Sequence, residues 1–538
     1  MLICAPVLAH DVETALADAG LAREGGADLV EYRLDGLFHG EGDEDGRLGA
    51  MRVVQESPLP CIVTCRPVSE GGEYDGDDAS RVSLFEALAT LERAPAYLDV
   101  EWSTWERSAN LRQKVLLCVA HPGQRRDVGT RLILSFHDFG GRPADLLRRV
   151  ERMSREHPGG EEGVVKVAYR ARSVRDALEV FDLLRERSRP MIAMAMGEAG
   201  VLSRVVGGKF GALLGFAPVR ASAATAEGQV TLGEMTGLYR AQSVRETTRV
   251  YGVIGWPVRQ SLSPLVHNTG FHAAGVEHDG VFVPLPVAES WEAFKASVLE
   301  LMGHEGVELC GAAVTSPHKE HLVRLAREEG WEIEERAGRI GAANTLVVEG
   351  ARARVLNTDA PAVAGWVRAG MGEVKGKRIG VLGAGGAARA AVCGLKDEGA
   401  EVVVFARRGE RAEALGKEFG VAWGAWEGLG ESGCEGVVHC TPAGMQGGGQ
   451  EGVSAVPRET LVRLRRGCAR GAPVVFDTVY NPLRTELMET AQGCGCEVVD
   501  GVGMFVRQAE MQFREWTGRE APSGLFARLV RTRLVGEV

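Results

Sequence analysis

Short apolar runs alternate with amphipathic stretches over residues 1–217. The segment SVRDALEVFDLLRER, residues 173–187, is typical of the amphipathic stretches because its apolar residues recur at helical spacing. The apolar runs, each as long as one strand, occupy residues 2–7, 29–34, 61–66, 97–102, 132–137, 164–169, 191–196 and 213–217. Eight strand–helix units in about 220 residues predict a compact (β/α)8 barrel. A doubly wound sheet is the alternative, but such sheets more often have five or six strands.

The sixth run, VVKVAY, carries Lys166 between valines. Lysine is almost never buried without a reason. Other polar residues end or follow the runs, where a barrel has its active-site mouth. They are Glu31, Arg33, Asp35, Arg66, Glu70, His137 and Arg204. The first three alternate along one run, so we expect their side chains on one face. A structural ion pair explains any single one of them, whereas the whole set at one mouth indicates a catalytic site.

The polar stretch 240–249 reads as a linker, and a different pattern follows it. The segment KGKRIGVLGAGGAARAAVCGL, residues 375–395, predicts a strand, a glycine turn and an alanine-rich helix. Gly383, Gly385 and Ala388 fit the pattern G-x-G-x-x-A in that setting. Such glycines let the backbone approach a pyrophosphate, which binds at the helix N-terminus. The sequence therefore predicts a Rossmann-like nucleotide-binding domain.

The next predicted strand, EVVVFARR at 401–408, follows at the distance of a β-α-β unit. A site for NAD usually places an acidic residue at the end of this strand. Here the strand ends in Ala406, Arg407 and Arg408, with Arg411 one turn on. Guanidinium groups suit a 2′-phosphate, so this pattern favours NADP(H) over NAD; the alternative is a solvated basic turn.

Composition narrows the class of protein. The chain has 538 residues, enough for two to four domains, and is 45% hydrophobic. A net charge of −11 argues against nucleic acid or an anionic membrane as partner but allows a small anionic substrate. The 11 cysteines show no disulfide or zinc pattern, and we expect no metal. The opening MLICAPVLAHDVETAL has no basic region and no apolar run reaches membrane length, so we expect a cytoplasmic protein without a targeting peptide.

The first half resembles type I 3-dehydroquinate dehydratase, and the second half resembles shikimate dehydrogenase. The marks of the first are EYRLD (31–35), CRPVSEGGE (65–73), SFHDF (135–139), KVA (166–168), MAMGEAGVLSR (194–204) and TAEGQ (225–229). The marks of the second are YGVIGWPVRQSLSPLVHN (251–268), AAVTSPHK (312–319), GAANTL (341–346), NTD (357–359), VLGAGGAARA (381–390), CTPAGM (440–445), DTVYNPLRTELM (477–488) and GVGMFVRQAEMQF (501–513). The resemblance covers nearly the whole chain in family order. It implies a fusion of two consecutive enzymes of the shikimate pathway, and similar fusions occur in plants.

The resemblance implies four domain segments. They are a barrel at 1–235, a linker at 236–249, a substrate-binding domain at 250–350 and 515–538, and an NADP-binding Rossmann-like domain at 351–514. The expected partners are the small molecules 3-dehydroquinate and 3-dehydroshikimate, and the sequence does not fix the oligomeric state.

For the barrel, the resemblance implies that Lys166 forms a Schiff base with the C3 ketone of 3-dehydroquinate. Burial beside other cations is expected to keep the amine neutral. His137 is the implied general acid and base, which takes the C2 proton and helps the C1 hydroxyl leave as water. Glu70 is implied to orient His137. Substrate hydroxyls are assigned to Glu31, Arg33, Arg66, Thr225 and Gln229, and the substrate carboxylate to Arg204.

For the second half, the resemblance implies that Lys319 donates a proton to the 3-dehydroshikimate ketone while Asp359 holds and tunes it. Ser261 and Ser263, two apart on a segment expected to be extended, are implied to bind the substrate carboxylate. The ring hydroxyls are assigned to Thr315, Asn344, Gln508 and nearby Tyr480. The cofactor is assigned to Gly383, Ala384, Gly385, Gly386, Ala387, Arg407, Arg408, Arg411, Thr441 and Gly501.

The chain departs from the dehydrogenase pattern at several positions. Gln260 stands for a usual histidine, Ala313 for the asparagine of N-V-T, Ala406 and Arg408 for the flanks of N-R-T, His439 and Cys440 for the usual N-A before T-P, and Ala360 for the glycine after NTD. In the dehydratase half, Thr225 stands where serine is common.

Three alternatives remain open from the sequence. The barrel lysine also suits a class I aldolase fused to an unrelated dehydrogenase. The second half could prefer quinate to shikimate, although the S-x-S pair favours shikimate. One half could be a non-catalytic binding module.

Overall fold

The computed structural model describes residues 1–120, 129–226, 228–276, 280–447 and 449–536. The chain forms two compact units. The first comprises Met1–Thr248 with Gly303–Gly306, and the second comprises Arg249–Met302 with Val307–Val538. Among the described residues, no helix is long and apolar enough to cross a membrane.

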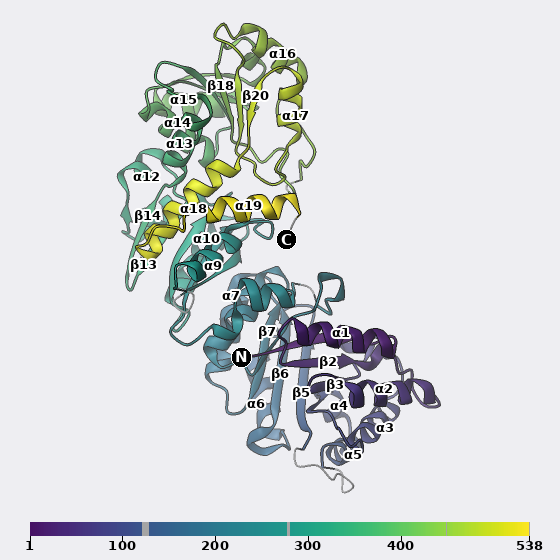
Figure 1. Ribbon diagram of the computed structural model, residues 1–538. Helices are drawn as coiled ribbons and strands as arrows, with labels where there is room; N and C mark the ends of the chain where they lie inside the picture. Colours follow the sequence, from purple (N-terminus) through teal and green to yellow (C-terminus); the bar gives the residue numbers. More distant parts are fainter. Residues whose placement is uncertain (121–128, 227, 277–279, 448, 537–538) are drawn as a thin grey trace. The chain divides into compact units, whose positions relative to one another are not determined.

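The first unit is built on eight parallel strands (Figure 1). They are β1 (Leu2–Leu8), β2 (Leu29–Arg33), β3 (Cys61–Thr64), β4 (Tyr97–Glu101), β5 (Arg131–Asp138), β6 (Val164–Arg170), β7 (Met191–Met196) and β8 (Leu214–Phe216). The order β7-β6-β5-β4-β3-β2-β1-β8 leaves one seam, between β7 and β8. There the Leu213 N–H donates to the Met191 carbonyl at 2.9 Å. The predicted (β/α)8 barrel is confirmed, and each apolar run corresponds to one strand.

Helices connect consecutive strands of the barrel. They are α1 (Val12–Glu24), α2 (Glu44–Glu56), α3 (Asp78–Ala89), α4 (Trp102–Arg107), α5 (Ala109–Val119), α6 (Leu146–Glu156), α7 (Val174–Arg185) and α8 (Val201–Val206). Local sequence fixes where several of them begin. The Asp11 carboxylate accepts the Thr14 N–H at 2.8 Å ahead of α1, and Asp77 caps α3 in the same way.

The second unit contains two six-stranded sheets. The first is mixed, with the order β10-β9-β11-β13-β14-β12. Its strands are β9 (Arg249–Gly255), β10 (Gly280–Pro286), β11 (Leu309–Val314), β12 (Glu332–Ile333), β13 (Thr345–Glu349) and β14 (Arg352–Leu356). Its helices are α9 (Ser263–Ala273), α10 (Trp291–Gly303), α11 (Lys319–Glu328) and α12 (Glu335–Ile340). The later helices α18 (Val502–Thr517) and α19 (Leu525–Val535) share its hydrophobic core through Phe513 and Phe526.

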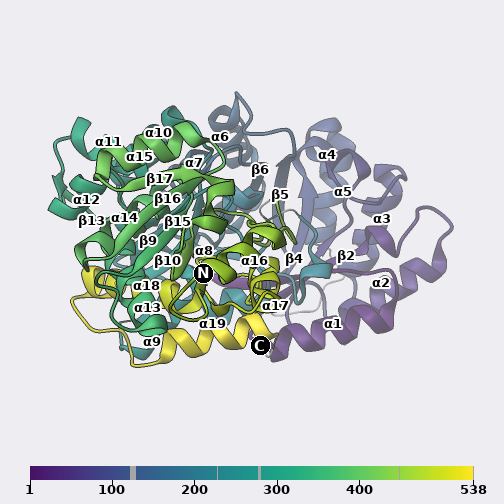
Figure 2. The same ribbon diagram turned by 90° about the horizontal axis from the view of Figure 1, so that it is seen from above.

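The second sheet is parallel, with the order β17-β16-β15-β18-β19-β20. Figure 2 shows β17, β16 and β15 side by side. Its strands are β15 (Arg378–Leu382), β16 (Glu401–Ala406), β17 (Ala422–Ala425), β18 (Gly436–His439), β19 (Val474–Asp477) and β20 (Glu497–Val499). Its helices are α13 (Asp359–Met371), α14 (Gly386–Asp397), α15 (Gly409–Phe419), α16 (Arg458–Gly467) and α17 (Glu486–Gly493). The strand order reverses between β15 and β18, which is where Rossmann-like sheets bind their ligands. The predicted Rossmann-like domain is confirmed.

Candidate active sites

A cavity at the barrel brings together the side chains that the sequence singled out. Its lining includes Glu31, Arg33, Arg66, Glu70, His137, Lys166, Arg204, Thr225 and Gln229. Apolar residues complete the wall: Phe139, Ala168, Met194, Met196, Phe216 and Ala226. The polar residues come from segments up to about 200 positions apart in the chain, and the barrel brings them together because its strands are parallel.

Lys166 lies within β6 and is only 4% exposed. Its Nζ donates to Asp99 Oδ2 at 2.8 Å and to Glu31 Oε1 at 3.1 Å, and it lies 4.5 Å from the centroid of the Phe216 ring. The charged groups in contact with the amine are therefore carboxylates. This corrects the expectation that cations adjoin it, because the acidic residues on β2 and β4 point to the same interior as β6.

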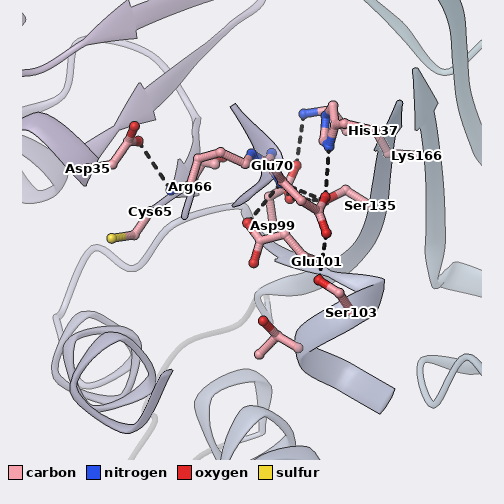
Figure 3. A network of polar contacts seen from close by, with 12 residues as sticks. Asp35, Cys65, Arg66, Glu70, Asp99, Glu101, Ser103, Ser135, His137 and Lys166 are labelled. Atoms are coloured by element: carbon pink, nitrogen blue, oxygen red, sulfur yellow. Dashed lines mark hydrogen bonds and ion pairs between the residues drawn. The ribbon is translucent and has the colours of Figure 1, made fainter. Parts of the chain in front are cut away.

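Two acidic residues in β4 were not singled out from the sequence. Asp99 and Glu101 alternate along β4 and are fully buried (Figure 3). Arg66 donates to Asp99 at 3.1 Å, to Glu101 at 2.9 Å and to the Ser135 hydroxyl at 2.8 Å. Burial opposes the charge of Arg66, but the nearby carboxylates, Asp99 first, raise its pKa overall. Charged residues inside the apolar run YLDVEW are the signal that could have revealed them, as Lys166 did for its own run.

His137 and Glu70 form a pair at the end of β5 (Figure 3). His137 Nδ1 lies 3.3 Å from Glu70 Oε2, and the Ser103 hydroxyl donates to Glu70 Oε1 at 2.6 Å. Burial, followed by repulsion from Glu101, raises the pKa of Glu70 to about 7. Burial, with the positive charges of Arg66 and Lys166, holds the pKa of His137 well below its ordinary value. The imidazole is therefore neutral and can accept a proton.

Arg204 is a buried cation with no counter-charge among the described residues. It is 3% exposed, and its Nε and Nη2 atoms have no hydrogen-bond partner among the residues that the structure describes. Nη1 lies 3.6 Å from the weakly accepting sulfur of Met194. Burial lowers the pKa of Arg204 to about 10. A guanidinium held open in a cavity suits a carboxylate that arrives with a ligand.

The remaining predicted barrel residues differ in their contacts. Thr225 and Gln229 bind each other, since the Thr225 N–H donates to Gln229 Oε1 at 2.9 Å. Arg33 donates to both oxygens of Asp35, at 2.8 and 2.7 Å. Asp35 lies in a 3-10 turn (Leu34–Gly36) beyond the strand, and it also accepts the Arg66 and Glu73 N–H groups. The expectation that Asp35 alternates along the strand with Glu31 and Arg33 is therefore wrong, and its carboxylate holds Arg33 and the following loop.

The second unit contains a lysine–aspartate pair between its two sheets. Lys319 begins α11 and Asp359 begins α13, and Lys319 Nζ donates to Asp359 Oδ2 at 2.6 Å. Asn344 Nδ2 donates to the other Asp359 oxygen at 2.9 Å and lies 3.4 Å from Gln508 Oε1. The structure thus brings together four of the residues assigned to this site, and Asp359 is held from two sides.

The serine pair and Tyr480 form a second part of this region. Ser263 is the first residue of α9, and its N–H donates to Ser261 Oγ at 3.2 Å. The expectation of an extended segment is wrong here, because the chain turns at Leu262 to enter the helix. Burial raises the pKa of Tyr480, whose hydroxyl contacts Ser261. Thr315 follows β11, and its N–H donates to the Ile254 carbonyl at the end of β9 at 2.9 Å.

The glycine turn after β15 fits a nucleotide. Gly383 has φ +123°, and a Cβ there would lie 3.1 Å from the Cys440 carbonyl oxygen. Gly385 faces open space and precedes the first turn of α14, where unpaired N–H groups favour a phosphate. A Cβ on Gly386 would lie 2.9 Å from Lys319 Cβ, so the turn adjoins the lysine–aspartate pair. The small residues Ala384 and Ala387 complete the turn.

The other residues assigned to the cofactor lie around this turn. Arg407, Arg408 and Arg411 are exposed beyond β16, and no carboxylate pairs with them within the described ranges. Thr441 follows β18, beside Gly383. Gly501 precedes α18, and a Cβ there would lie 2.7 Å from the Asp477 carbonyl oxygen, so only glycine fits without a shift. Over the ranges that the structure covers, no group of three His, Cys, Asp or Glu side chains could hold a metal.

Comparison with known proteins assigns both halves. The family model for type I 3-dehydroquinase matches residues 3–246. The models for the shikimate dehydrogenase substrate binding domain and the shikimate 5′-dehydrogenase C-terminal domain match residues 253–346 and 501–531. The bifunctional 3-dehydroquinate dehydratase/shikimate dehydrogenase of Arabidopsis thaliana, a chloroplastic protein, is 32% identical over 98% of this chain and 83% of its own length. The chain belongs to this bifunctional family.

Shikimate dehydrogenases match the second half of the chain. The shikimate dehydrogenase (NADP(+)) of Methanocella arvoryzae is 36% identical over 53% of this chain and 99% of its own length. A crystal structure of the Thermus thermophilus enzyme in complex with NADP(H) and shikimate is 31% identical, with a TM-score of 0.45, over 53% of this chain and 99% of that one. The family assignment agrees with the resemblance read from the sequence motifs.

Proposed function

We propose that this chain catalyses two consecutive reactions. The barrel dehydrates 3-dehydroquinate to 3-dehydroshikimate, and the second unit reduces that product to shikimate with NADPH. Membership of the bifunctional family supports both activities. The observation that carries the dehydratase half is one cavity that holds Lys166, His137 and the unpaired Arg204.

In the barrel, Lys166 Nζ attacks the C3 ketone of the substrate. Attack requires the neutral amine, so a proton leaves Nζ first, and Glu31 is the carboxylate in contact that receives it. Burial opposes the charge of Asp99, but Arg66 and Lys166 hold its pKa well below the ordinary value, so it stays ionised. Loss of water from the adduct gives an iminium, which accepts the electrons released at C2. The neutral His137 takes the C2 proton and returns it to the C1 hydroxyl, which leaves as water. Hydrolysis of the iminium then frees 3-dehydroshikimate and Lys166.

The remaining barrel residues bind and orient the substrate. Arg204 binds the substrate carboxylate through two parallel N–H donors. The carboxylate supplies the counter-charge that the buried guanidinium lacks among the described residues. Glu70 holds His137 through Nδ1. The substrate hydroxyls are bound by Glu31, Arg33, Arg66, Thr225 and Gln229.

In the second unit, Lys319 donates a proton to the ketone oxygen of 3-dehydroshikimate, and Asp359 and Asn344 fix its position. NADPH, when bound, supplies the hydride. Ser261 and Ser263 bind the substrate carboxylate, and Tyr480 lies beside them. Thr315, Asn344 and Gln508 bind the ring hydroxyls.

The cofactor binds in the crevice between the ends of β15 and β18. The turn of Gly383, Gly385 and Gly386 receives the pyrophosphate at the N-terminus of α14, with Ala384, Ala387, Thr441 and Gly501 around it. The exposed Arg407, Arg408 and Arg411 receive the 2′-phosphate, which distinguishes NADP from NAD.

A cytoplasmic location and the four domain segments stay predictions.

A coupled assay tests the proposal. Purified protein receives 3-dehydroquinate and NADPH together, and shikimate is measured by chromatography while NADPH absorbance is followed. We expect shikimate and oxidised cofactor in equal amounts. If no shikimate forms from 3-dehydroquinate, and none forms when 3-dehydroshikimate is added, the proposal is contradicted. Retro-aldol fragments would indicate an aldolase. Side-by-side oxidation of shikimate and quinate separates the two dehydrogenase specificities.

A further inference from the structure

A buried histidine lies beside the nucleotide crevice, outside the residues assigned above. His439 ends β18 and is fully buried, as is Asp477 at the end of β19. The two residues are paired in the sheet register, and Leu382, which ends β15, is the partner of His439 on its other side. His439 is thus next to the point where the strand order reverses, at a position where the dehydrogenase pattern usually has asparagine.

The contacts of Asp477 fix the proton on one nitrogen of His439. Its Oδ1 accepts the Val479 N–H at 3.0 Å, and its Oδ2 accepts the Thr485 hydroxyl at 2.6 Å. His439 Nδ1 lies 2.8 Å from the same Oδ1. Because the carboxylate accepts both of these hydrogen bonds, it acts as an acceptor toward His439 as well, so Nδ1 carries a hydrogen and donates it.

The other nitrogen then determines the direction of the next hydrogen bond. His439 Nε2 lies 2.5 Å from Thr441 Oγ1, which also accepts the Ala443 N–H at 3.4 Å. In the described part of the chain, Nε2 is the only acceptor in contact with this hydroxyl. The neutral imidazole with Nδ1–H satisfies every member of the group, because the Thr441 hydroxyl donates to Nε2. Thr441 is then left with a free lone pair and no free hydrogen.

The Thr441 side chain adjoins the glycine turn at which the cofactor is proposed to bind. Thr441 is half-buried, and a Cβ placed on Gly383 would lie 3.2 Å from Thr441 Cγ2. A hydroxyl that can only accept cannot bind a phosphate oxygen, which is itself an acceptor at neutral pH. It suits the donor groups of a nucleotide, which are the ribose hydroxyls and the carboxamide N–H2.

We propose that Thr441 recognises a hydrogen-bond donor on the nicotinamide–ribose half of NADP(H), and that His439, held by Asp477, is a positioning residue that makes Thr441 an obligate acceptor. The proposal rests on the proposed dehydrogenase function. It assigns two functions to the histidine at 439: its Nδ1–H satisfies Asp477, and its Nε2 orients the threonine.

The test measures binding directly, by titration calorimetry of NADP+ against the full chain. Thr441→Val removes the acceptor at nearly constant volume, and Thr441→Ser keeps it. His439→Asn retains a donor toward Asp477 but removes the Nε2 acceptor. We expect Thr441→Val and His439→Asn each to weaken NADP+ binding about five- to tenfold, with no further loss when they are combined, and Thr441→Ser to bind like the wild type.

Further ligands separate this role from a structural one and identify the donor. 2′,5′-ADP lacks the nicotinamide–ribose half, so its affinity should be the same in the wild type and in every variant. 3-Acetylpyridine adenine dinucleotide phosphate lacks the carboxamide N–H2. If Thr441→Val weakens the binding of this analogue as much as the binding of NADP+, a ribose hydroxyl is the donor. If the substitution leaves the affinity for the analogue unchanged, the carboxamide is the donor.

Other outcomes would overturn the proposal. Equal affinity of the wild type and Thr441→Val for NADP+ would do so, as would a parallel loss of 2′,5′-ADP binding. Nitrogen-15 NMR of His439 gives an independent check that needs no variant, and a hydrogen on Nε2 would contradict it. A wild-type protein that binds no NADP+ at all would instead contradict the dehydrogenase function itself.

Discussion

Replacing Arg204 by methionine should stabilise the substrate-free protein and weaken the barrel site. Arg204 is buried without a counter-charge among the described residues, and its pKa is lowered from 12.5 to about 10. That difference corresponds to about 3 kcal/mol of unfavourable free energy for holding the charge in the folded protein. Methionine has a similar shape and no charge. We expect the free energy of unfolding to rise by about 2 kcal/mol, after some loss of packing.

The same substitution removes the group that binds the substrate carboxylate. Two charge-assisted hydrogen bonds contribute about 1.5–3 kcal/mol each, so we expect the KM for 3-dehydroquinate to rise about 100-fold or more. Urea unfolding measures the stability, and the near-ultraviolet absorbance of the enone product measures the dehydration. A substrate-like carboxylate should raise the unfolding midpoint of the wild type but leave that of Arg204→Met unchanged.

Arg66→Met is the matched control in the same cavity. Arg66 is equally buried, but it pairs with Asp99 and Glu101, so its removal takes one cationic partner from each of these buried carboxylates, which keep Lys166 and Arg81 respectively. We expect this variant to lose about 3–5 kcal/mol of stability, the opposite sign to Arg204→Met. Equal destabilisation by the two substitutions, or an unchanged KM in Arg204→Met, would refute the assignment of Arg204 as an unpaired receptor for the substrate.

Three further outcomes are expected. The pKa of Glu70 is raised to about 7, so dehydratase kcat/KM should fall as the pH drops through about 7, because the protonated carboxyl no longer accepts from His137. Glu70→Gln should be slower and should lack this limb of the pH profile. An unchanged limb in the variant would assign the limb to another group. Arg407→Ala should weaken NADP+ binding about tenfold in titrations and NAD+ binding less than twofold; equal losses would show that this arginine does not contact the 2′-phosphate. Lys166→Ala should abolish dehydration and leave shikimate oxidation unchanged, because the two sites lie in separate compact units; loss of both activities in a folded variant would contradict two independent sites.

The barrel was predictable because each strand is a short, mostly apolar run between turns. Parallel strands that are covered on both faces produce that pattern, and the run around Lys166 shows how a single buried charge marks a site within it. Asp99 and Glu101 mark β4 in the same way, as charges inside an apolar strand. The partners of these charges were not predictable, since β2, β4 and β6 are brought together only by barrel closure.

The second unit shows a different limit. The glycine turn and the arginines after β16 follow from local sequence, because the strand–turn–helix chemistry is contiguous. The contact between Lys319 and Asp359 joins the first residues of two helices 40 positions apart, and only family resemblance pointed to it. The serine pair was misjudged because a helix begins at Ser263, where Pro264 fits the first turn of α9.

Reductive trapping tests the central claim of the dehydratase half most directly. Borohydride is added while the protein turns over 3-dehydroquinate, and the digested protein is examined by mass spectrometry. The account predicts a stable adduct on the peptide that contains Lys166, with its mass increased by that of the reduced substrate imine, and loss of dehydratase activity. An unmodified Lys166 peptide, or an adduct confined to another lysine, would contradict it.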